Sequence, residues 1–371
     1  MSEKEKKFGD VAFEDCIMQK GTPTTAGSEI LDGFNAPFDA AVIEKLNEAK
    51  IPLTGTVSMS EFGLAKSDTI EDLTSVSGVN KAVRAVASGQ TEYALCNDVF
   101  GKICCLAPFN GLACIRPTYG TVSRYGLIPS VSSMEQIGIV CKNPSDGYRL
   151  LSVIAGNDSR DGAMFPETSY AYKPCNENIK IAIPDNVWGG NEDDGKIVPM
   201  LESKFSASRI ELKYFDCYSQ VLHILGYAEL CNNTNRYDGV KFGHRTEKSG
   251  GINDMYINTR SEAFTLETKL AIITGAMVLS QDYYEKYYEK AMKIRRLIKD
   301  SLDFGAYDVI ALPIRSGGTP YEQSAWYALP ALAGLPSLSV PLGHNLGVLL
   351  IADVKNENAL WGAWEVLSRE I

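Results

Sequence analysis

The fold of this chain is decided by the stretch PTYGTVSRYGLIPSVSSMEQIGIV, which runs from Pro117 to Val140. Glycines interrupt it at uneven intervals, so it is too irregular to form one helix or one strand. The order of residues in this stretch is too specific to match another protein by chance. The sequence on either side of it has to supply the regular elements.

Helical and strand-like periods alternate on both sides of this stretch, which indicates α/β layers. Apolar residues that recur on one face predict three helices, at residues 39–50, 79–88 and 282–302. Asp39 is expected to cap the start of the first helix, and Gly89 to end the second.

Short apolar runs predict strands at residues 52–57, 180–183, 309–312 and 348–352. We expect the last three to share one sheet, because each has the length and composition of a buried strand. Residues 184–200, with the acidic and Gly-rich segment GGNEDDG, are the best candidate for a loop. No linker in the chain is long enough to mark a domain boundary.

The composition is that of an ordinary globular protein, with 45% hydrophobic and 22% charged residues in a chain of 371. A net charge of -10 argues against a phosphate-binding surface, so we expect no direct contact with nucleic acid. No apolar stretch has the length of a signal peptide or a membrane span. We therefore expect a cytoplasmic protein that does not contact the membrane.

The cysteines and histidines do not form a metal-binding pattern. The histidines, His223, His244 and His344, lie far apart, and no C-x-x-C spacing occurs among the nine cysteines. We predict no metal and no cofactor. The adjacent Cys104 and Cys105 lie in the apolar run ICCLAPF, where thiols are usually buried and inert.

Four further blocks accompany the stretch from Pro117 to Val140. They are GTPTTAGSEIL at 21–31, MSEFG at 59–63, NRYDGVKFGHRTE at 235–247 and LPALAGLPSLSVP at 329–341. In this order, the blocks resemble the amidase-signature family, and within it the branch of tRNA-dependent amidotransferase A subunits. The resemblance covers most of the chain.

The resemblance implies an α/β fold with a single large mixed β-sheet flanked by helices on both faces. We expect residues 1–371 to form one domain of this kind, truncated at the N-terminus, because the family's helical lead-in is missing. The family is similar to serine hydrolases in its chemistry. An unprotonated Lys draws a proton through a bridging Ser and so activates the nucleophilic Ser.

The resemblance places the three catalytic positions of the family at Glu14, Gly78 and Lys102. Glu14 stands where the family has its Lys, Gly78 where it has the bridging Ser, and Lys102 where it has the nucleophile. No functional catalytic residue is therefore expected at these positions. The same three residues, with Ser77 and Asp98, are expected to line any pocket that remains.

Other departures from the family point the same way. Bulky residues replace glycines that let backbone amides reach the substrate oxygen, which predicts a blocked oxyanion hole. These residues are Val76, Val79, Val99 and Phe100. The amidotransferase branch carries arginines at the positions of Leu270 and Ala271, so a substrate carboxylate would lose its clamp.

Two interpretations of the altered positions compete. Glu14 and Lys102 have opposite charges, and one hypothesis is that they form an ion pair that fills the old site. The alternative is a rebuilt amidase site, with Ser75 or Ser77 activated by Lys102, or with a thiolate at Cys104. A nearby Glu14 would raise the pKa of Lys102 and oppose such a role.

A third interpretation is a small-anion binding module. Lys102 together with Lys81 and Arg84 could gather an anion at the N-terminus of the helix predicted at 79–88. The simpler interpretation is that Lys81 and Arg84 face solvent.

The sequence favours a catalytically inactive amidase-like protein, a pseudo-amidase, that acts as a structural or regulatory partner. The resemblance offers amidotransferase B- and C-type subunits, or an active paralogue, as candidate partners.

Overall fold

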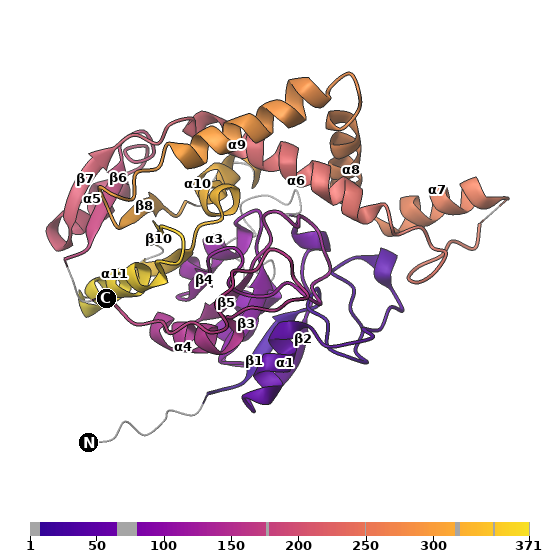
Figure 1. Cartoon of the computed structure of the whole chain (residues 1–371), viewed down its shortest axis with the longest axis horizontal. Helices are drawn as coiled ribbons and strands as arrows, with labels where there is room; N and C mark the ends of the chain where they lie inside the picture. Colours follow the sequence, from indigo (N-terminus) through magenta and orange to yellow (C-terminus); the bar gives the residue numbers. More distant parts are fainter. Residues whose placement is uncertain are drawn as a thin grey trace.

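A computed structural model of the chain describes residues 8–64, 80–175, 178–248, 250–315, 320–343 and 346–370. Ten strands of these residues join in one sheet, in the order β2-β1-β3-β5-β4-β9-β10-β8-β6-β7 (Figure 1). Their bounds are Val11–Glu14 (β1), Leu53–Val57 (β2), Tyr93–Asn97 (β3), Ala113–Arg116 (β4), Ile137–Cys141 (β5), Lys180–Pro184 (β6), Ser206–Ile210 (β7), Val309–Pro313 (β8), Ser337–Gly343 (β9) and Leu346–Ala352 (β10).

The sheet is parallel at its two edges and antiparallel in its centre. β1 pairs in parallel with β2 and β3, and β6 pairs in parallel with β7 and β8, whereas the pairs between β3 and β8 are antiparallel. This confirms the predicted mixed sheet. β6, β8 and β10 are neighbours, so the three apolar runs do share one sheet, and β2 confirms the strand predicted at 52–57.

Helices cover both faces of the sheet, as the sequence predicted. α1 (Ala41–Glu48), α4 (Pro144–Ile154) and α11 (Glu357–Leu367) lie on the face to which Phe13 of β1 points. α2 (Lys81–Ala87) and α3 (Lys102–Phe109) lie on the opposite face, against Ala12. Side chains alternate along a strand, so consecutive residues of β1 anchor the two layers.

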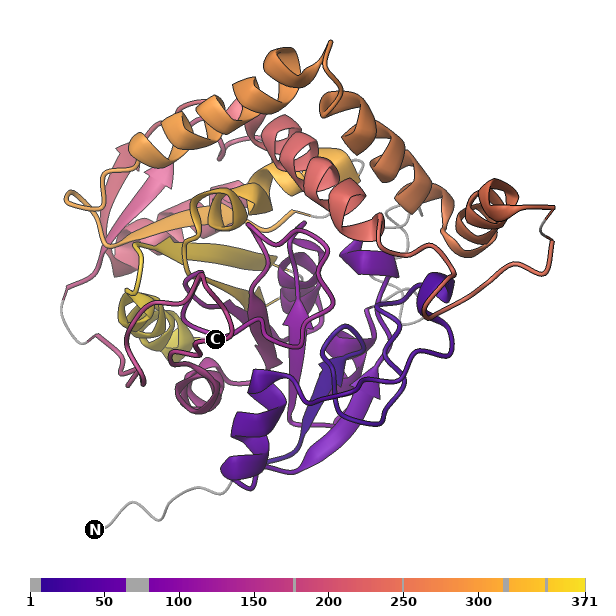
Figure 2. The same ribbon diagram turned by 45° about the vertical axis from the view of Figure 1, so that its right-hand side comes forward.

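A group of helices packs beside the sheet. Their bounds are Asp194–Lys204 (α5), Tyr218–Thr234 (α6), Ile252–Ala263 (α7), Leu266–Val278 (α8), Lys290–Asp300 (α9) and Pro320–Ala333 (α10). α6 packs against α8, α9 and α10. α8 lies on the outer side of α6, and α7 extends away from the body of the molecule (Figure 2).

Three local predictions need correction. Asp39 does not cap α1, because Ala40 is the N-cap residue and the Asp39 carboxylate accepts a hydrogen bond from the Lys20 backbone at 2.7 Å. Residues 184–200 are not all loop, since α5 begins within them. The helix predicted at 282–302 is divided into a π-helix, Tyr284–Glu289, and α9, and both Tyr284 and Tyr287 face solvent.

The helix predicted at 79–88 is confirmed as α2, with Gly89 just beyond its end in the left-handed region at φ 76°. Within the described parts of the chain, no helix combines the length and the apolar character needed to cross a bilayer. That residues 1–371 form a single domain stays a prediction.

Candidate functional site

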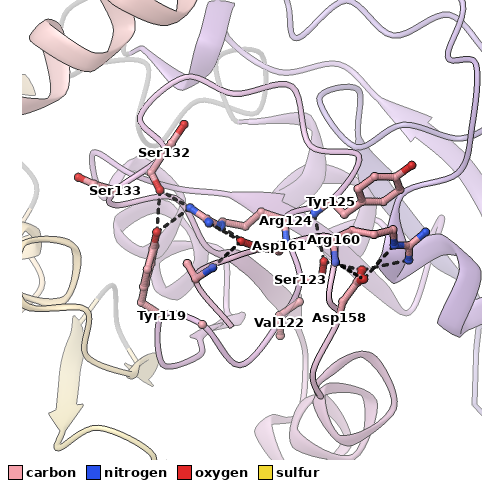
Figure 3. A network of polar contacts seen from close by, with 12 residues as sticks. Tyr119, Val122, Ser123, Arg124, Tyr125, Ser132, Ser133, Asp158, Arg160 and Asp161 are labelled. Carbon is pink, nitrogen blue, oxygen red and sulfur yellow. Dashed lines mark hydrogen bonds and ion pairs between the residues drawn. The ribbon is translucent and has the colours of Figure 1, made fainter. Parts of the chain in front are cut away.

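The stretch from Pro117 to Val140 is held together by Arg124 (Figure 3). Its guanidinium makes two hydrogen bonds to the Asp161 carboxylate, Nε–Oδ2 at 2.9 Å and Nη2–Oδ1 at 2.6 Å. It also donates to the Tyr119 hydroxyl at 2.6 Å and to the Ser132 carbonyl. Burial alone would raise the pKa of Asp161, but the hydrogen bonds from Arg124 hold that pKa below its ordinary value.

A second ion pair continues this network outward. Arg160 donates to Asp158 at 2.8 Å and to Glu44 of α1 at 2.6 Å, and its guanidinium lies 4.0 Å from the centre of the Tyr125 ring (Figure 3). Ser123 donates to Asp158 at 2.9 Å. The residues of this stretch therefore bind one another and their neighbours, which holds its irregular backbone in place.

Glu14 ends β1 and is fully buried. Its carboxylate accepts a hydrogen bond from the Asn80 side chain at 3.0 Å and from the Asn97 backbone at 2.8 Å. Burial raises the pKa of Glu14 to about 7, and the carboxylates of Asp98 and Asp15 add to the rise. Asn80 and Asn97 thus donate hydrogen bonds to both carboxyl oxygens of Glu14.

Lys102 is the first residue of α3 and is half-buried. Gly101 precedes it in the left-handed region at φ 79°, and the Asp98 carboxylate accepts from the Cys104 backbone at 2.8 Å, which caps the helix. Between the described residues Glu14 and Lys102 no ion pair forms, so that hypothesis is wrong. The hydrogen bonds of Glu14 go to uncharged donors instead.

Ser77 and Gly78, with Ser75, Val76 and Val79, lie outside the described residues. The site residues that the structure does place, Glu14, Asp98 and Lys102, come from the ends of β1 and β3 and from the start of α3.

Phe100 fills space next to α3 that a glycine would leave open. Its ring is 8% exposed and lies 5.5 Å from the centre of the His223 ring and 6.1 Å from that of Tyr227. Gly226 of α6 makes room for it, since a Cβ there would lie 3.2 Å from the Phe100 ring. Val99 is also buried. The start of α3 is therefore covered by apolar side chains.

A small cavity of about 20 Å³ lies next to the start of α3. Its walls include three cysteines, Cys96, Cys104 and Cys114, together with Asp98 and Arg116. That volume holds about one water molecule, so it is too small for an amide substrate. Burial raises the pKa of Cys104 well above its ordinary value, and Asp98 adds to the rise, so its thiol stays protonated.

The two positions of the family's arginines face opposite ways. Ala271 is buried at 1% exposure, whereas Leu270 is 55% exposed and points to solvent. Only position 271 could direct an arginine inward, and alanine cannot bind a carboxylate.

Lys81 and Arg84 are exposed on α2, as the simpler interpretation expected. The Asn80 side chain accepts from the Ala82 and Val83 backbones at 2.8 and 3.4 Å, so the first amides of α2 already have an acceptor. Among the described residues, no group of three or more His, Cys, Asp or Glu side chains has the arrangement of a metal site.

Asn80 and Asn97 are the site residues that sequence reasoning missed. Asn80 carries a recognisable signal, because Asn is a favoured N-cap residue and this one lies at the start of the predicted helix. Asn97 acts through its backbone N–H, which leaves no signal in the sequence.

The sequence profile of the Amidase family matches residues 11–70 and 82–360. This is most of the chain, and the chain belongs to the amidase family. The break in the match, at residues 71–81, contains Gly78, where the resemblance predicted the bridging Ser.

The relatives narrow this class to the amidotransferase branch that the sequence blocks indicated. The A subunit of glutamyl-tRNA(Gln) amidotransferase from Sulfolobus acidocaldarius is 35% identical, over 91% of this chain and 79% of that protein. Its counterpart from Lachnospira eligens is 34% identical, over 94% of this chain and 81% of that protein. The resemblance inferred from the sequence blocks is confirmed.

Solved structures agree. The crystal structure of the counterpart from Thermotoga maritima superimposes with a TM-score of 0.73 at 26% identity, over 95% of this chain and 81% of that one. The peptide amidase of Stenotrophomonas maltophilia superimposes with a TM-score of 0.77 over 98% of this chain and 82% of that one. At 20% identity, the second likeness shows the fold alone.

Proposed function

We propose that this chain is a catalytically inactive member of the amidase family, which keeps the fold and serves as a structural or regulatory partner. The observation that carries the proposal is the state of Glu14. The family's mechanism needs an unprotonated amine at this position to draw a proton from the serines. Here a fully buried carboxyl group has both oxygens hydrogen-bonded, to Asn80 and to Asn97.

The start of α3 supports the same conclusion. Lys102 replaces the hydroxyl nucleophile, and an ammonium group has no lone pair with which to attack a carbonyl carbon. Val99 and Phe100 are packed where the family has small residues, so a substrate oxygen has no open approach to the backbone amides. The Cys104 alternative is disfavoured because its raised pKa keeps the thiol protonated at neutral pH.

The partners that fit this proposal are those of the relatives, whose name describes one component of an amidotransferase. We propose B- or C-type amidotransferase subunits, or an active paralogue, as the binding partner. The chain superimposes on the A subunit from Thermotoga maritima over 95% of its length, which supports retention of the family's outer shape.

An amidase assay on the purified chain tests the proposal. Ammonia release from glutamine and from simple amides is measured for the chain alone and with B- and C-type subunits added, and a catalytically active relative provides the positive control. We expect no release above that of the Lys102→Ala variant. Turnover by the parent that is abolished in Lys102→Ala or in Ser77→Ala would overturn the proposal and support a rebuilt Ser–Lys site.

A further inference from the structure

Exposed apolar side chains are concentrated in one part of this molecule. Of the 17 large apolar side chains that are exposed among the described residues, 12 lie between residues 252 and 297. That segment comprises α7, α8, the π-helix and α9. Single exposed apolar residues are normal on a protein surface, but a concentration of this kind marks a contact surface.

α8 is the centre of this concentration. Leu266, Leu270, Ile273 and Met277 are 66, 55, 65 and 43% exposed and follow the spacing i, i+4, i+7 and i+11, which places them on one face. We call these four residues the α8 stripe. The opposite face of α8 packs against α6, with Gly275 close to the Tyr227 carbonyl.

The exposed side of α8 carries no charge. Besides the α8 stripe, Ala276 is its other exposed residue, while Glu267 and Lys269 are only partly exposed at its flanks. A helix that packs on a core by one face usually carries charged or polar residues on its exposed face, and α8 does not. Figure 2 shows α8 along the outer side of the molecule, where no other element of the described chain covers it.

We propose that a second copy of this chain covers the α8 stripe, through an antiparallel pairing of α8 with α8 about a two-fold axis. An isologous contact uses the same patch on both copies, so the patch must match itself. In an antiparallel pairing centred on the stripe, Leu270 of one copy opposes Ile273 of the other, and Leu266 opposes Met277. All four opposed side chains are apolar, so no like charges meet at the centre of the contact.

The exposed area fits this occupant. The α8 stripe with Ile252 and Ile257 of α7, which are 63 and 62% exposed, presents roughly 600 Å² of apolar surface, near the upper limit for a monomer. A standard interface buries about 800 Å² on each partner, and the polar rim of the two helices supplies the remainder. The α8 stripe carries no charge, so it offers no electrostatic complementarity to an acidic or a basic partner.

One substitution relative to the family contributes to the stripe directly. The resemblance to the amidotransferase branch implies an arginine at the position of Leu270, and Leu270 points to solvent. An arginine at this position would place a charge at the centre of the paired helices. The exchange to leucine makes the stripe continuous, and this inference holds whether or not the chain has amidase activity.

The test is the molar mass of the full chain in solution, measured by analytical ultracentrifugation from about 1 to about 100 µM protein. We expect twice the chain mass of 40.5 kDa. Leu270→Arg is expected to weaken the dimer at least about 100-fold, because the two-fold axis places the charge in the contact twice. Ile273→Glu provides a second variant, and circular dichroism verifies that each variant folds.

Tyr214→Glu is the matched control, because Tyr214 is 41% exposed and lies outside α7, α8 and the π-helix. It should leave the dimer unchanged. Raising the salt from about 50 to about 500 mM should tighten the dimer, because it screens repulsion between copies of the same charge. A monomer at every concentration, or a dimer that survives both Leu270→Arg and Ile273→Glu, overturns the proposal. An acidic or basic partner that instead binds the stripe and is released by salt also overturns it.

Discussion

Arg124 is partly buried and Glu14 is fully buried, and the two side chains have opposite kinds of partner. Arg124 has a full counter-charge in Asp161, to which its guanidinium donates two hydrogen bonds. Glu14 accepts hydrogen bonds from the neutral donors Asn80 and Asn97, and the charges that act on it, Asp98 and Asp15, are of its own sign. The network around Arg124 is thus built on opposite charges, whereas the surroundings of the Glu14 carboxyl group are not.

This difference predicts opposite responses to pH. Asp161 has a pKa held below its ordinary value by Arg124 against the effect of burial, so its contribution to stability is present at neutral pH and lost in acid. Glu14 has a raised pKa, so its contribution is present in acid and lost as the pH rises toward 7. The surroundings of Glu14 should therefore be the part that weakens the fold at neutral pH.

The largest expected effect is that of Arg124→Met. The substitution leaves the buried Asp161 carboxylate uncompensated and should lower the free energy of unfolding by about 3 to 5 kcal/mol at neutral pH. The control is Arg296→Met, since Arg296 and Asp300 form an exposed pair at 77 and 51% and should contribute less than about 1 kcal/mol. Urea denaturation of the two variants measures the difference. Equal losses of unfolding free energy would show that the Arg124–Asp161 pair contributes no more than an exposed ion pair.

Glu14→Gln should have the next largest effect, and its sign depends on pH. The folded pKa of about 7 lies above the ordinary value of 4.5, so the parent protein loses about 3 kcal/mol between these pH values, because Glu14 ionises in the unfolded chain while it stays protonated in the folded one. The glutamine variant cannot ionise and should keep that stability. Urea denaturation at pH 5 and pH 8 gives the change for each protein. If both proteins show the same pH dependence, Glu14 is not a buried, uncompensated carboxyl group.

Gly101→Ala tests why a glycine is needed directly before α3. A Cβ at Gly101 would lie 2.2 Å from the Tyr327 Cβ, whereas at Gly111 nothing lies within 4 Å, although both residues have positive φ, 79° and 70°. Gly101→Ala should therefore destabilise the protein by about 2 kcal/mol more than Gly111→Ala, whose own cost is about 1 kcal/mol of backbone strain. Thermal denaturation compares them. Similar losses would mean that packing against α10 does not require the glycine.

The sequence predicted the sheet and both helical layers well, because apolar periods report directly on which side chains face a core. It paired Glu14 with Lys102 wrongly, since opposite charges in aligned motifs say nothing about the direction of side chains. Glu14 binds Asn97 through a backbone N–H, and the Phe100 ring depends on a glycine in α6, Gly226. Contacts of this kind between distant segments leave no local pattern. The predicted cap by Asp39 was wrong for the same reason, because its carboxylate accepts a hydrogen bond from the Lys20 backbone instead.

The smallest expected effect belongs to the double substitution Lys81→Ala with Arg84→Ala. Both residues are exposed, and the Asn80 side chain already accepts from the first amides of α2, so these cations neither stabilise the helix start nor face an open anion site. We expect a change in the free energy of unfolding below about 0.5 kcal/mol. Phosphate and dicarboxylates should raise the melting temperature of neither protein. A rise in the parent that the double variant lacks would mean that Lys81 and Arg84 bind an anion at the start of α2. The region around Glu14 would then have a binding function.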